Sequence, residues 1–298
     1  MQRVLLTGAN GLLGGHIVRA LESHLPHPTI CALASPRNTT SALETVDLAD
    51  LVGVRESVRR FTPTHIVHVA AMTSVAACYA DPAAAARINV DATRVLAEEA
   101  ARCGARLLFT STDMVFAGDA APYDEDAPPA PVNVYGCSKL AAERAIAPLP
   151  RMLVVRIPLL YGCPVDAARE TTFTQQARSL RSGAAIPLFE DEFRSPLFVE
   201  DAATGLLALL FSACVGVMHL PGPQRVSRFE LGLALADALG ADRALLRAVS
   251  RESIAAAEPR PRDLSLATAR TSDWPVGLAL RSPADAMGEA VSRLAARG

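Results

Sequence analysis

The spacing of three glycines near the start of the chain constrains its fold more than any other feature. Gly8, Gly11 and Gly14 recur every three residues between an apolar run at residues 4–7 and a helical pattern at residues 11–22. In such a strand–turn–helix unit the first glycine permits the tight turn. The second lets the backbone approach a pyrophosphate, and the third lets the helix pack on the strand. The spacing predicts dinucleotide binding at the helix N-terminus, although a tight turn alone also uses glycines.

Short apolar runs then alternate with helical patterns, as in βαβ units of a parallel sheet. This predicts an α/β fold, a Rossmann-type doubly wound parallel sheet with a smaller C-terminal α/β lobe. We expect strands at residues 4–7, 29–34, up to 46–47, 65–70, 106–111 and 152–157, and helices at 11–22, 51–61, 82–103 and 134–147. Asp50 and Asp81 are expected helix caps, and Gly104 an expected helix end.

The regular alternation of apolar runs and helical patterns ends at Gly162. Helical patterns at residues 171–182, 200–211 and 229–239 alternate with short extended pieces at 186–189 and 217–220. We therefore expect residues 1–162 to form a dinucleotide-binding Rossmann domain, with segments returning from the C-terminal half. Residues 163–298 are expected to form mainly a substrate-binding lobe.

The end of the second predicted strand bears on cofactor choice. An NAD site carries Asp or Glu there, about 20 residues after the glycines, to bond the ribose 2′-hydroxyl. This chain has Ser35, Pro36 and Arg37 instead, with no acid until Glu44. A hydroxyl and a guanidinium suit a 2′-phosphate, although an ordinary solvated arginine is the alternative. The sequence predicts that NADP(H) is preferred, with NAD(H) as the second option.

The basic residues are nearly all of one type. Of 29 basic residues, 28 are arginines and one is a lysine, Lys139, four positions after Tyr135. This spacing puts both side chains on one helix face. A neighbouring ammonium should lower the pKa of the phenol from about 10 and make Tyr135 a usable general acid. A surface pair left by codon bias is the plain alternative.

Polar side chains also follow the fifth predicted strand. Ser111, Thr112 and Asp113 come at the carboxyl edge, where open α/β sheets bind ligands. A hydroxyl there can bond the carbonyl oxygen that Tyr135 protonates, and a turn cap is the alternative interpretation. Arg194 is a candidate to bind a substrate phosphate, because a guanidinium can donate two parallel hydrogen bonds to a phosphate. An ordinary surface arginine fits that position equally well.

Together these residues resemble the extended short-chain dehydrogenase/reductase family over essentially the whole chain, and its dTDP-4-dehydrorhamnose reductase branch in particular. The motifs that carry the resemblance are S-T-D-M-V-F-A-G at 111–118, P-Y at 122–123, P-V-N-V-Y-G-C-S-K-L at 131–140 with Glu143, G-V-M-H-L at 216–220 and R-P-R-D at 260–263. The resemblance implies hydride delivery from a nicotinamide to a keto carbon. Tyr135 would donate the proton, Lys139 would hold the nicotinamide ribose, Thr112 would orient the carbonyl and Asn89 would brace the helix behind the site.

The glycine turn, the strand ends and the resemblance together define the expected contacts. The cofactor is expected to contact Gly8, Asn10, Gly11, Leu12, Leu13, Ser35, Arg37, Asp47, Leu48, Ala70, Ala71, Met72, Ser111, Tyr135, Lys139 and Ile157. The substrate is expected to contact Thr73, Thr112, Asp113, Met114 and Arg194. No metal site is expected, and His65 and His68, on a predicted strand, are interpreted as structural.

The departures from the branch concern the substrate. Met114 stands where the branch has the tyrosine of S-T-D-Y-V-F, and Leu159 where it has the tryptophan of R-T-S-W. Residues 75–79 also lack the acidic residues of the branch. The first two changes remove aromatic stacking surface near the nucleotide part of the substrate. We expect the catalytic residues to be intact and the binding of the substrate to be altered.

Composition excludes several classes of function. A net charge of −2 provides no basic field for a nucleic acid or an anionic membrane. No apolar run reaches the roughly 18 residues of a membrane span, and we expect no signal peptide because the first predicted strand begins at residue 4. The six cysteines are scattered without a C-x-x-C pair, which favours a reducing compartment over zinc or disulfides. We expect a cytoplasmic protein with a small-molecule partner, and a homodimer is compatible with the sequence.

The leading hypothesis is an NADPH-dependent reductase of the keto group of a nucleotide-linked deoxy-keto-sugar. Met114 and Leu159 prompt a first alternative, a reductase or epimerase of another carbonyl substrate. A second alternative is a non-catalytic NADP-binding regulatory subunit. The chain is also similar to the beta subunit of methionine adenosyltransferase, including an R-I-P stretch at residues 156–158.

Overall fold

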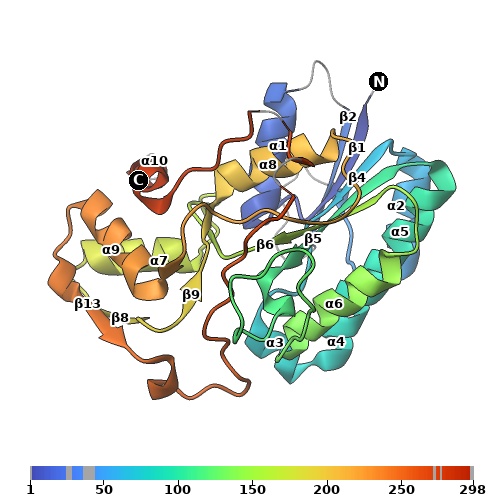
Figure 1. The fold of residues 1–298 in the computed structure, drawn as a ribbon. Helices are drawn as coiled ribbons and strands as arrows, with labels where there is room; N and C mark the ends of the chain where they lie inside the picture. The colour runs from blue at the N-terminus through green and yellow to red at the C-terminus, as the bar shows by residue number, and fades with distance from the viewer. Residues whose placement is uncertain (1, 25–28, 36–43, 271–272, 276, 296–298) are drawn as a thin grey trace.

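The computed structural model describes residues 2–24, 29–35, 44–270, 273–275 and 277–295. At its centre is a seven-stranded parallel sheet in the order β11–β6–β5–β4–β1–β2–β3 (Figure 1). Its strands are β1 (Arg3–Thr7), β2 (Thr29–Ala34), β3 (Glu44–Thr45), β4 (His65–His68), β5 (Arg106–Thr112), β6 (Met152–Ile157) and β11 (Gly216–His219). The strand order reverses between β1 and β4, which opens a crevice at their carboxyl ends. The predicted doubly wound sheet is confirmed.

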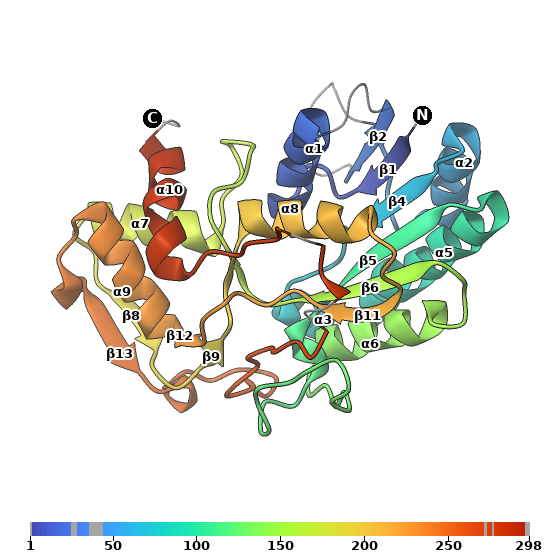
Figure 2. The same cartoon turned by 45° about the horizontal axis from the view of Figure 1, so that its top comes forward.

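Helices cover both faces of this sheet (Figure 2). On one face lie α1 (Leu12–His24) and α8 (Val199–Leu210), and on the other lie α2 (Leu51–Phe61), α5 (Ala92–Cys103) and α6 (Val134–Ile146). Successive residues of β1 enter opposite cores, Val4 and Leu6 on the α1 side and Leu5 on the α2 side. Burial on both faces explains why the strands are continuous apolar runs.

The smaller lobe is built from the second half of the chain (Figure 1). It contains the helices α7 (Thr172–Arg181), α9 (Arg228–Leu239) and α10 (Pro283–Ala295), the strand pairs β8 (Ile186–Phe189) with β13 (Leu246–Val249) and β9 (Phe193–Arg194) with β12 (Val226–Ser227), and the short helices η4 (Arg243–Leu245) and η5 (Arg251–Ser253). The pair β7 (Leu160–Tyr161) and β10 (Leu197–Phe198) connects it to α8. The domain boundary at residue 162 stays a prediction. In the parts of the chain placed here, no helix is long and apolar enough to cross a membrane.

Local capping explains most element ends, and one helix differs from expectation. Asp50 accepts a hydrogen bond from the Gly53 amide at 3.1 Å and starts α2, as predicted. Asp81 caps α4 (Pro82–Ala86), also as predicted. The helix expected at residues 82–103 is interrupted by a π-helical turn, η2 (Arg87–Asp91). Such turns insert one residue into a helix, and here the turn carries the buried Asn89.

A further short helix, α3 (Val75–Ala80), was not predicted. Ser74 caps it by accepting a hydrogen bond from the Ala77 amide at 3.2 Å. It is a six-residue segment without helical periodicity, so the sequence carries little signal for it. The 3₁₀ turn η3 (Asp113–Val115) follows β5 and is capped by Thr112.

The packing of α1 on the glycine turn leads to a first prediction. A Cβ on Gly14 would lie 2.0 Å from the Gly8 carbonyl oxygen. We expect Gly14→Ala to lower the free energy of unfolding by about 1–3 kcal/mol, because backbone must move to admit the methyl group. Gly288→Ala is the matched control, since a Cβ in that exposed position of α10 meets nothing within 4 Å. Urea unfolding should show the control unchanged or more stable by up to about 1 kcal/mol, and equal losses would contradict the packing argument.

Candidate active site

The glycine turn presents open backbone at the crevice. Gly8 has a φ of 77°, which favours glycine, and a Cβ there would lie 3.0 Å from the Ala70 backbone. The amide of Gly11 donates to the Gly8 carbonyl at 2.8 Å, which closes the turn before α1 begins. Leu12 and Leu13 lie in the first turn of α1, whose amides have no partner within the helix. A turn with glycines at both ends beside a helix N-terminus fits a dinucleotide pyrophosphate.

Ser35 and Asn10 meet at the end of β2. The Ser35 amide lies 3.4 Å from Asn10 Oδ1, and Asn10 Nδ2 lies 3.5 Å from the Ser35 carbonyl oxygen. Glu44, the nearest downstream acid, pairs with Arg60 and accepts from Ser57 at 3.0 Å. This carboxylate is therefore already bonded by an arginine and a hydroxyl. Arg37 lies outside the described residues.

The other predicted cofactor residues follow strands at the same carboxyl edge. Ala70, Ala71 and Met72 come after β4, Asp47 and Leu48 after β3, Ser111 is in β5, and Ile157 ends β6. Ile157 pairs in register with Thr112. The structure therefore brings these residues to one edge of the sheet, because parallel strands end on the same side.

Helix α6 carries Tyr135 against the turn that follows β5. Asn133 caps this helix by accepting from the Gly136 amide at 2.7 Å. A Cβ on Gly136 would lie 2.1 Å from the Met114 carbonyl oxygen, so the helix approaches η3 at backbone distance. This approach brings the Thr112 hydroxyl within hydrogen-bonding reach of the Tyr135 phenol.

Lys139 lies one helical turn beyond Tyr135 and is 2% exposed. Its Nζ stands 4.0 Å from the centroid of the Phe109 ring, and no described residue makes an ion pair or a hydrogen bond with it. Burial lowers the pKa of Lys139 to about 7, with the Glu143 carboxylate acting in the opposite direction. A guanidinium keeps its charge at any accessible pH. This explains physically why the site uses the single lysine of the chain.

The expectation that this ammonium lowers the pKa of the phenol was wrong for this structure. Burial raises the pKa of Tyr135 above its ordinary value, and the Asp113 carboxylate adds to the rise. The bond with Thr112 acts against it. Desolvation therefore outweighs any attraction between the two groups. Tyr135 is protonated at neutral pH, as a proton donor must be.

Thr112 has a capping role besides its position next to Tyr135. Its hydroxyl donates to Asp113 Oδ1 at 3.0 Å and accepts from the Met114 amide at 3.2 Å. Asp113 Oδ2 lies 3.5 Å from Arg194 Nε, and burial raises the pKa of this carboxyl group. Ser111 Oγ is buried without a hydrogen-bond partner among the described residues. The strand end thus retains an unused hydroxyl beside the crevice.

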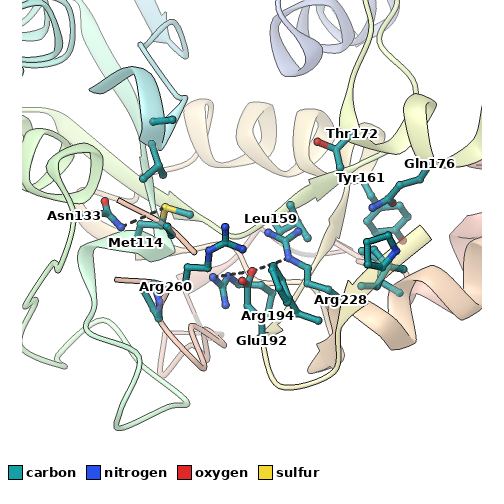
Figure 3. Close-up of a pocket in the computed structure, with 18 of the residues that line it drawn as sticks. Met114, Asn133, Leu159, Tyr161, Thr172, Gln176, Glu192, Arg194, Arg228 and Arg260 are labelled. Carbon is teal, nitrogen blue, oxygen red and sulfur yellow. Dashed lines mark hydrogen bonds and ion pairs between the residues drawn. The ribbon is translucent and has the colours of Figure 1, made fainter. Parts of the chain in front are cut away.

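A cavity of about 680 Å³ lies between the sheet and the smaller lobe (Figure 3). Its walls are mostly apolar and include Met114 and Leu159, the two positions where the sequence departs from the rhamnose reductase motifs. Both departures therefore face the space available to a substrate. Of the residues predicted to contact the substrate, Met114 and Arg194 line this cavity, whereas Thr73, Thr112 and Asp113 do not.

Three arginines project into the cavity, and two of them are held by carboxylates (Figure 3). Arg194 is buried and lies 3.3 Å from Glu192, and Arg228 lies 2.8 Å from the same carboxylate. Arg260 instead stacks over the Phe189 ring at 4.8 Å and has no ion pair with any described residue. It is the cation that remains available to an anionic ligand.

Sequence patterns alone did not indicate Glu192, Arg228 or the cavity-facing position of Arg260. Arg260 belongs to the R-P-R-D motif, so a signal for it existed. Glu192 and Arg228 are 36 positions apart and share no local pattern. Only the fold places them at one cavity wall.

Comparisons with known proteins agree with the fold and the motifs. The RmlD substrate binding domain family matches residues 1–295. Methionine adenosyltransferase 2 subunit beta of Pongo abelii is 33% identical over 291 residues, which cover 95% of this chain and 84% of that protein. The probable low-salt glycan biosynthesis reductase Agl14 of Haloferax volcanii is 31% identical over 264 residues, which cover 86% of this chain and 87% of that protein.

One solved structure shows the same arrangement at full length. The crystal structure of dTDP-4-dehydrorhamnose reductase from Bacillus anthracis in complex with NADP has a TM-score of 0.85 and 27% identity. The match covers 98% of this chain and 100% of that chain. The resemblance expected from the motifs is confirmed.

The buried lysine predicts a distinct dependence of stability on pH. The pKa of Lys139 is about 7 in the folded chain, below the ordinary value of 10.5. The folded state therefore bears the cost of a buried charge below pH 7, and this cost disappears as pH rises toward 10. We expect Lys139→Met to raise the free energy of unfolding by about 1 kcal/mol or more at pH 6, with the gain vanishing near pH 10. Urea unfolding across pH measures it, and a gain independent of pH would contradict the placement of the lysine.

Proposed function

The chain belongs to the RmlD substrate binding domain family, and from this premise we propose that it is an NADPH-dependent reductase. Its substrate is the keto group of a nucleotide-linked deoxy-keto-sugar. The observation that carries the proposal is the placement of Thr112, Tyr135 and Lys139 at the carboxyl edge of the sheet. Met114 and Asn133, each two positions from Thr112 and Tyr135 respectively, line the cavity.

The proposed reaction divides its work between the dinucleotide and the chain. When bound, the dinucleotide supplies a hydride from its nicotinamide to the carbonyl carbon. Tyr135 gives its phenolic proton to the carbonyl oxygen, so that C=O becomes CH–OH and a tyrosinate remains until solvent returns a proton. Thr112 orients the oxygen by turning toward it the hydroxyl proton that bonds Asp113 in the free chain. Lys139 holds the ribose, and in its charged form it favours the tyrosinate.

Burial suits both groups to this direction of the reaction. The raised pKa of Tyr135 keeps the proton on the phenol until a carbonyl oxygen develops negative charge. The pKa of Lys139 near 7 leaves its charge sensitive to what binds beside it. An anionic dinucleotide in the crevice would favour the ammonium form.

The cavity supports an anionic substrate of mixed polarity. Arg260 offers a guanidinium that forms no ion pair with the residues placed in the structure, and the apolar walls suit a deoxy sugar and a base. Agl14 is a probable reductase of glycan biosynthesis, and the Bacillus anthracis enzyme is a dTDP-4-dehydrorhamnose reductase. Met114 and Leu159 lack the rings of the rhamnose reductase motifs, so we propose that the sugar or its nucleotide differs from that of the Bacillus enzyme.

Several further assignments belong to this proposal. We propose NADP(H) as the preferred cofactor, with NAD(H) as a weaker alternative, because the sequence after β2 contains Ser35 and Arg37 and no acid before Glu44. Residues 1–162 would hold the cofactor and residues 163–298 mainly the substrate. A cytoplasmic location and a homodimer complete the proposal.

A second function is favoured by one observation. The identity of 33% over 291 residues to a methionine adenosyltransferase beta subunit extends through the whole fold. On this alternative, the chain binds NADP and attaches to a methionine adenosyltransferase without reducing a sugar. Tight binding to such an enzyme, together with no turnover on any keto-sugar, would favour it over the reductase.

Loss of the phenolic proton tests the reductase. We expect Tyr135→Phe to lower kcat for NADPH oxidation by about 10²–10⁴, because the carbonyl oxygen loses its general acid. The measurement uses a panel of nucleotide-linked 4-keto-sugars, and NADPH binding to the same variant serves as the control for folding. Turnover that survives the substitution would remove Tyr135 from the acid role.

Cofactor selectivity tests the 2′-phosphate assignment. We expect Arg37→Ala to weaken NADPH binding about tenfold or more and to leave NADH binding unchanged, since only NADPH carries the phosphate. Arg19→Ala, an exposed arginine on α1, is the matched control and should alter neither affinity. Fluorescence titration measures both. Equal affinities of the native chain for NADPH and NADH would refute the assignment.

A further inference from the structure

A buried histidine joins the ends of two central strands to the helix behind the site. Thr7, which ends β1, places its Oγ1 2.7 Å from His68 Nδ1. His68 ends β4, and the sheet register pairs it with Thr7, so this contact is built into the fold. The other ring nitrogen, Nε2, lies 2.9 Å from Thr93 Oγ1 on α5. All three side chains are at most 1% exposed.

The direction of each hydrogen bond in this network follows from the number of protons available. The Thr93 hydroxyl donates its single proton to the Asn89 carbonyl oxygen at 2.7 Å. It must therefore accept from His68 Nε2, which carries the ring proton of the neutral imidazole. His68 Nδ1 is then an acceptor, and the Thr7 hydroxyl donates to it. The Thr7 oxygen in turn accepts from the Ala70 amide at 3.3 Å.

One end of this hydrogen-bond network reaches α6, the helix that carries Tyr135. The Asn89 side chain accepts from the Met72 amide at 2.8 Å and donates to the Met72 carbonyl at 3.1 Å and to Ser138 Oγ at 2.9 Å. The Ser138 hydroxyl donates to the Tyr135 carbonyl oxygen at 2.7 Å. Asn89 therefore braces α6, and His68 holds the backbone of Asn89 through Thr93.

The other end reaches the predicted cofactor wall. Thr7 precedes Gly8, and the Ala70 backbone that Thr7 binds lies against Gly8. The His68 ring also lies 5.5 Å from the Phe109 ring, whose centroid lies 4.0 Å from Lys139 Nζ. One imidazole therefore stands behind the dinucleotide turn, the tyrosine helix and the lysine.

We propose that His68 is a positioning residue that aligns the glycine turn with α6, the helix that carries Tyr135. Each ring nitrogen has a separate task. Nδ1 holds Thr7 and, through it, the Gly8–Ala70 wall. Nε2 holds Thr93 and, through Asn89 and Ser138, the helix that carries Tyr135. The role in turnover rests on the proposed reductase function, whereas the role in dinucleotide binding does not.

The task requires a neutral imidazole. A rigid ring offers one donor and one acceptor on different sides, which matches the two hydroxyls. A protonated ring would lose the acceptor that Thr7 needs. Burial and the nearby Lys139 lower the pKa of His68 to about 3, so the neutral form persists at physiological pH. His68 acts by geometry and transfers no proton.

Two substitutions separate the two nitrogens. His68→Asn places an amide near Nδ1, which keeps an acceptor for Thr7 and loses the bond to Thr93. His68→Gln reaches the position of Nε2, which keeps a donor for Thr93 and loses the bond to Thr7. We expect His68→Asn to lower kcat at least tenfold with the Kd for NADPH within twofold. We expect His68→Gln to raise that Kd at least fivefold with kcat within twofold. His68→Phe removes both hydrogen bonds and should therefore lower kcat and raise the Kd together.

Further variants keep the test decisive. Thr93→Val removes the Nε2 contact with His68 in place and should reproduce the His68→Asn result. His65→Asn and His65→Gln, on the same strand but at its far end, are matched controls that should change neither kcat nor Kd. If the Asn and Gln variants of His68 change kcat and Kd alike, or alter only the melting temperature, the inference is wrong. A native chain that binds NADPH but reduces no keto-sugar would defeat the proposed function, and the contrast in Kd alone would still decide the role of Nδ1.

Discussion

Two close approaches between backbones hold this site together, and each requires the absence of a Cβ atom. Gly14 lets α1 approach the Gly8 carbonyl, where a Cβ would stand 2.0 Å away. Gly136 lets α6 approach the Met114 carbonyl, where a Cβ would stand 2.1 Å away. The first contact aims the amides of α1 at the crevice. The second brings Tyr135 to Thr112, so the binding and the chemical halves of the site depend on the same constraint.

Desolvation dominates the electrostatics behind these contacts. Burial favours the neutral form of Tyr135, Lys139 and His68, and the side chains of the last two are at most 2% exposed. For Tyr135 and His68 this secures one protonation state, which proton donation and hydrogen bonding both require. For Lys139 burial brings the pKa to about 7, so the side chain gains or loses its charge near neutral pH. Charge is retained instead at the cavity wall, where Glu192 pairs with Arg194 and Arg228.

The framework is shared by relatives whose names state different roles. A glycan biosynthesis reductase, a dTDP-4-dehydrorhamnose reductase and a methionine adenosyltransferase beta subunit all match most of this chain. A fold of this kind therefore does not decide the function, which depends on the site grafted onto it. In this chain the distinguishing positions lie in the cavity, where Met114 and Leu159 replace ring side chains and Arg260 has no ion pair within the described part of the chain.

The sequence by itself determined the features that local spacing encodes. The glycines at 8, 11 and 14, the apolar runs of the strands and the cap at Asp50 are read within a few residues, because turn sterics and helix ends are local. The placement of Tyr135 and Lys139 on one helix face follows from helical periodicity in the same way. Tertiary structure decided what depends on burial and on distant contacts. The π turn at Asn89, the directions of the Tyr135 and Lys139 pKa shifts, the ion pairs of Glu192 and the two bonds of His68 all require residues far apart in sequence to meet in a space from which water is excluded.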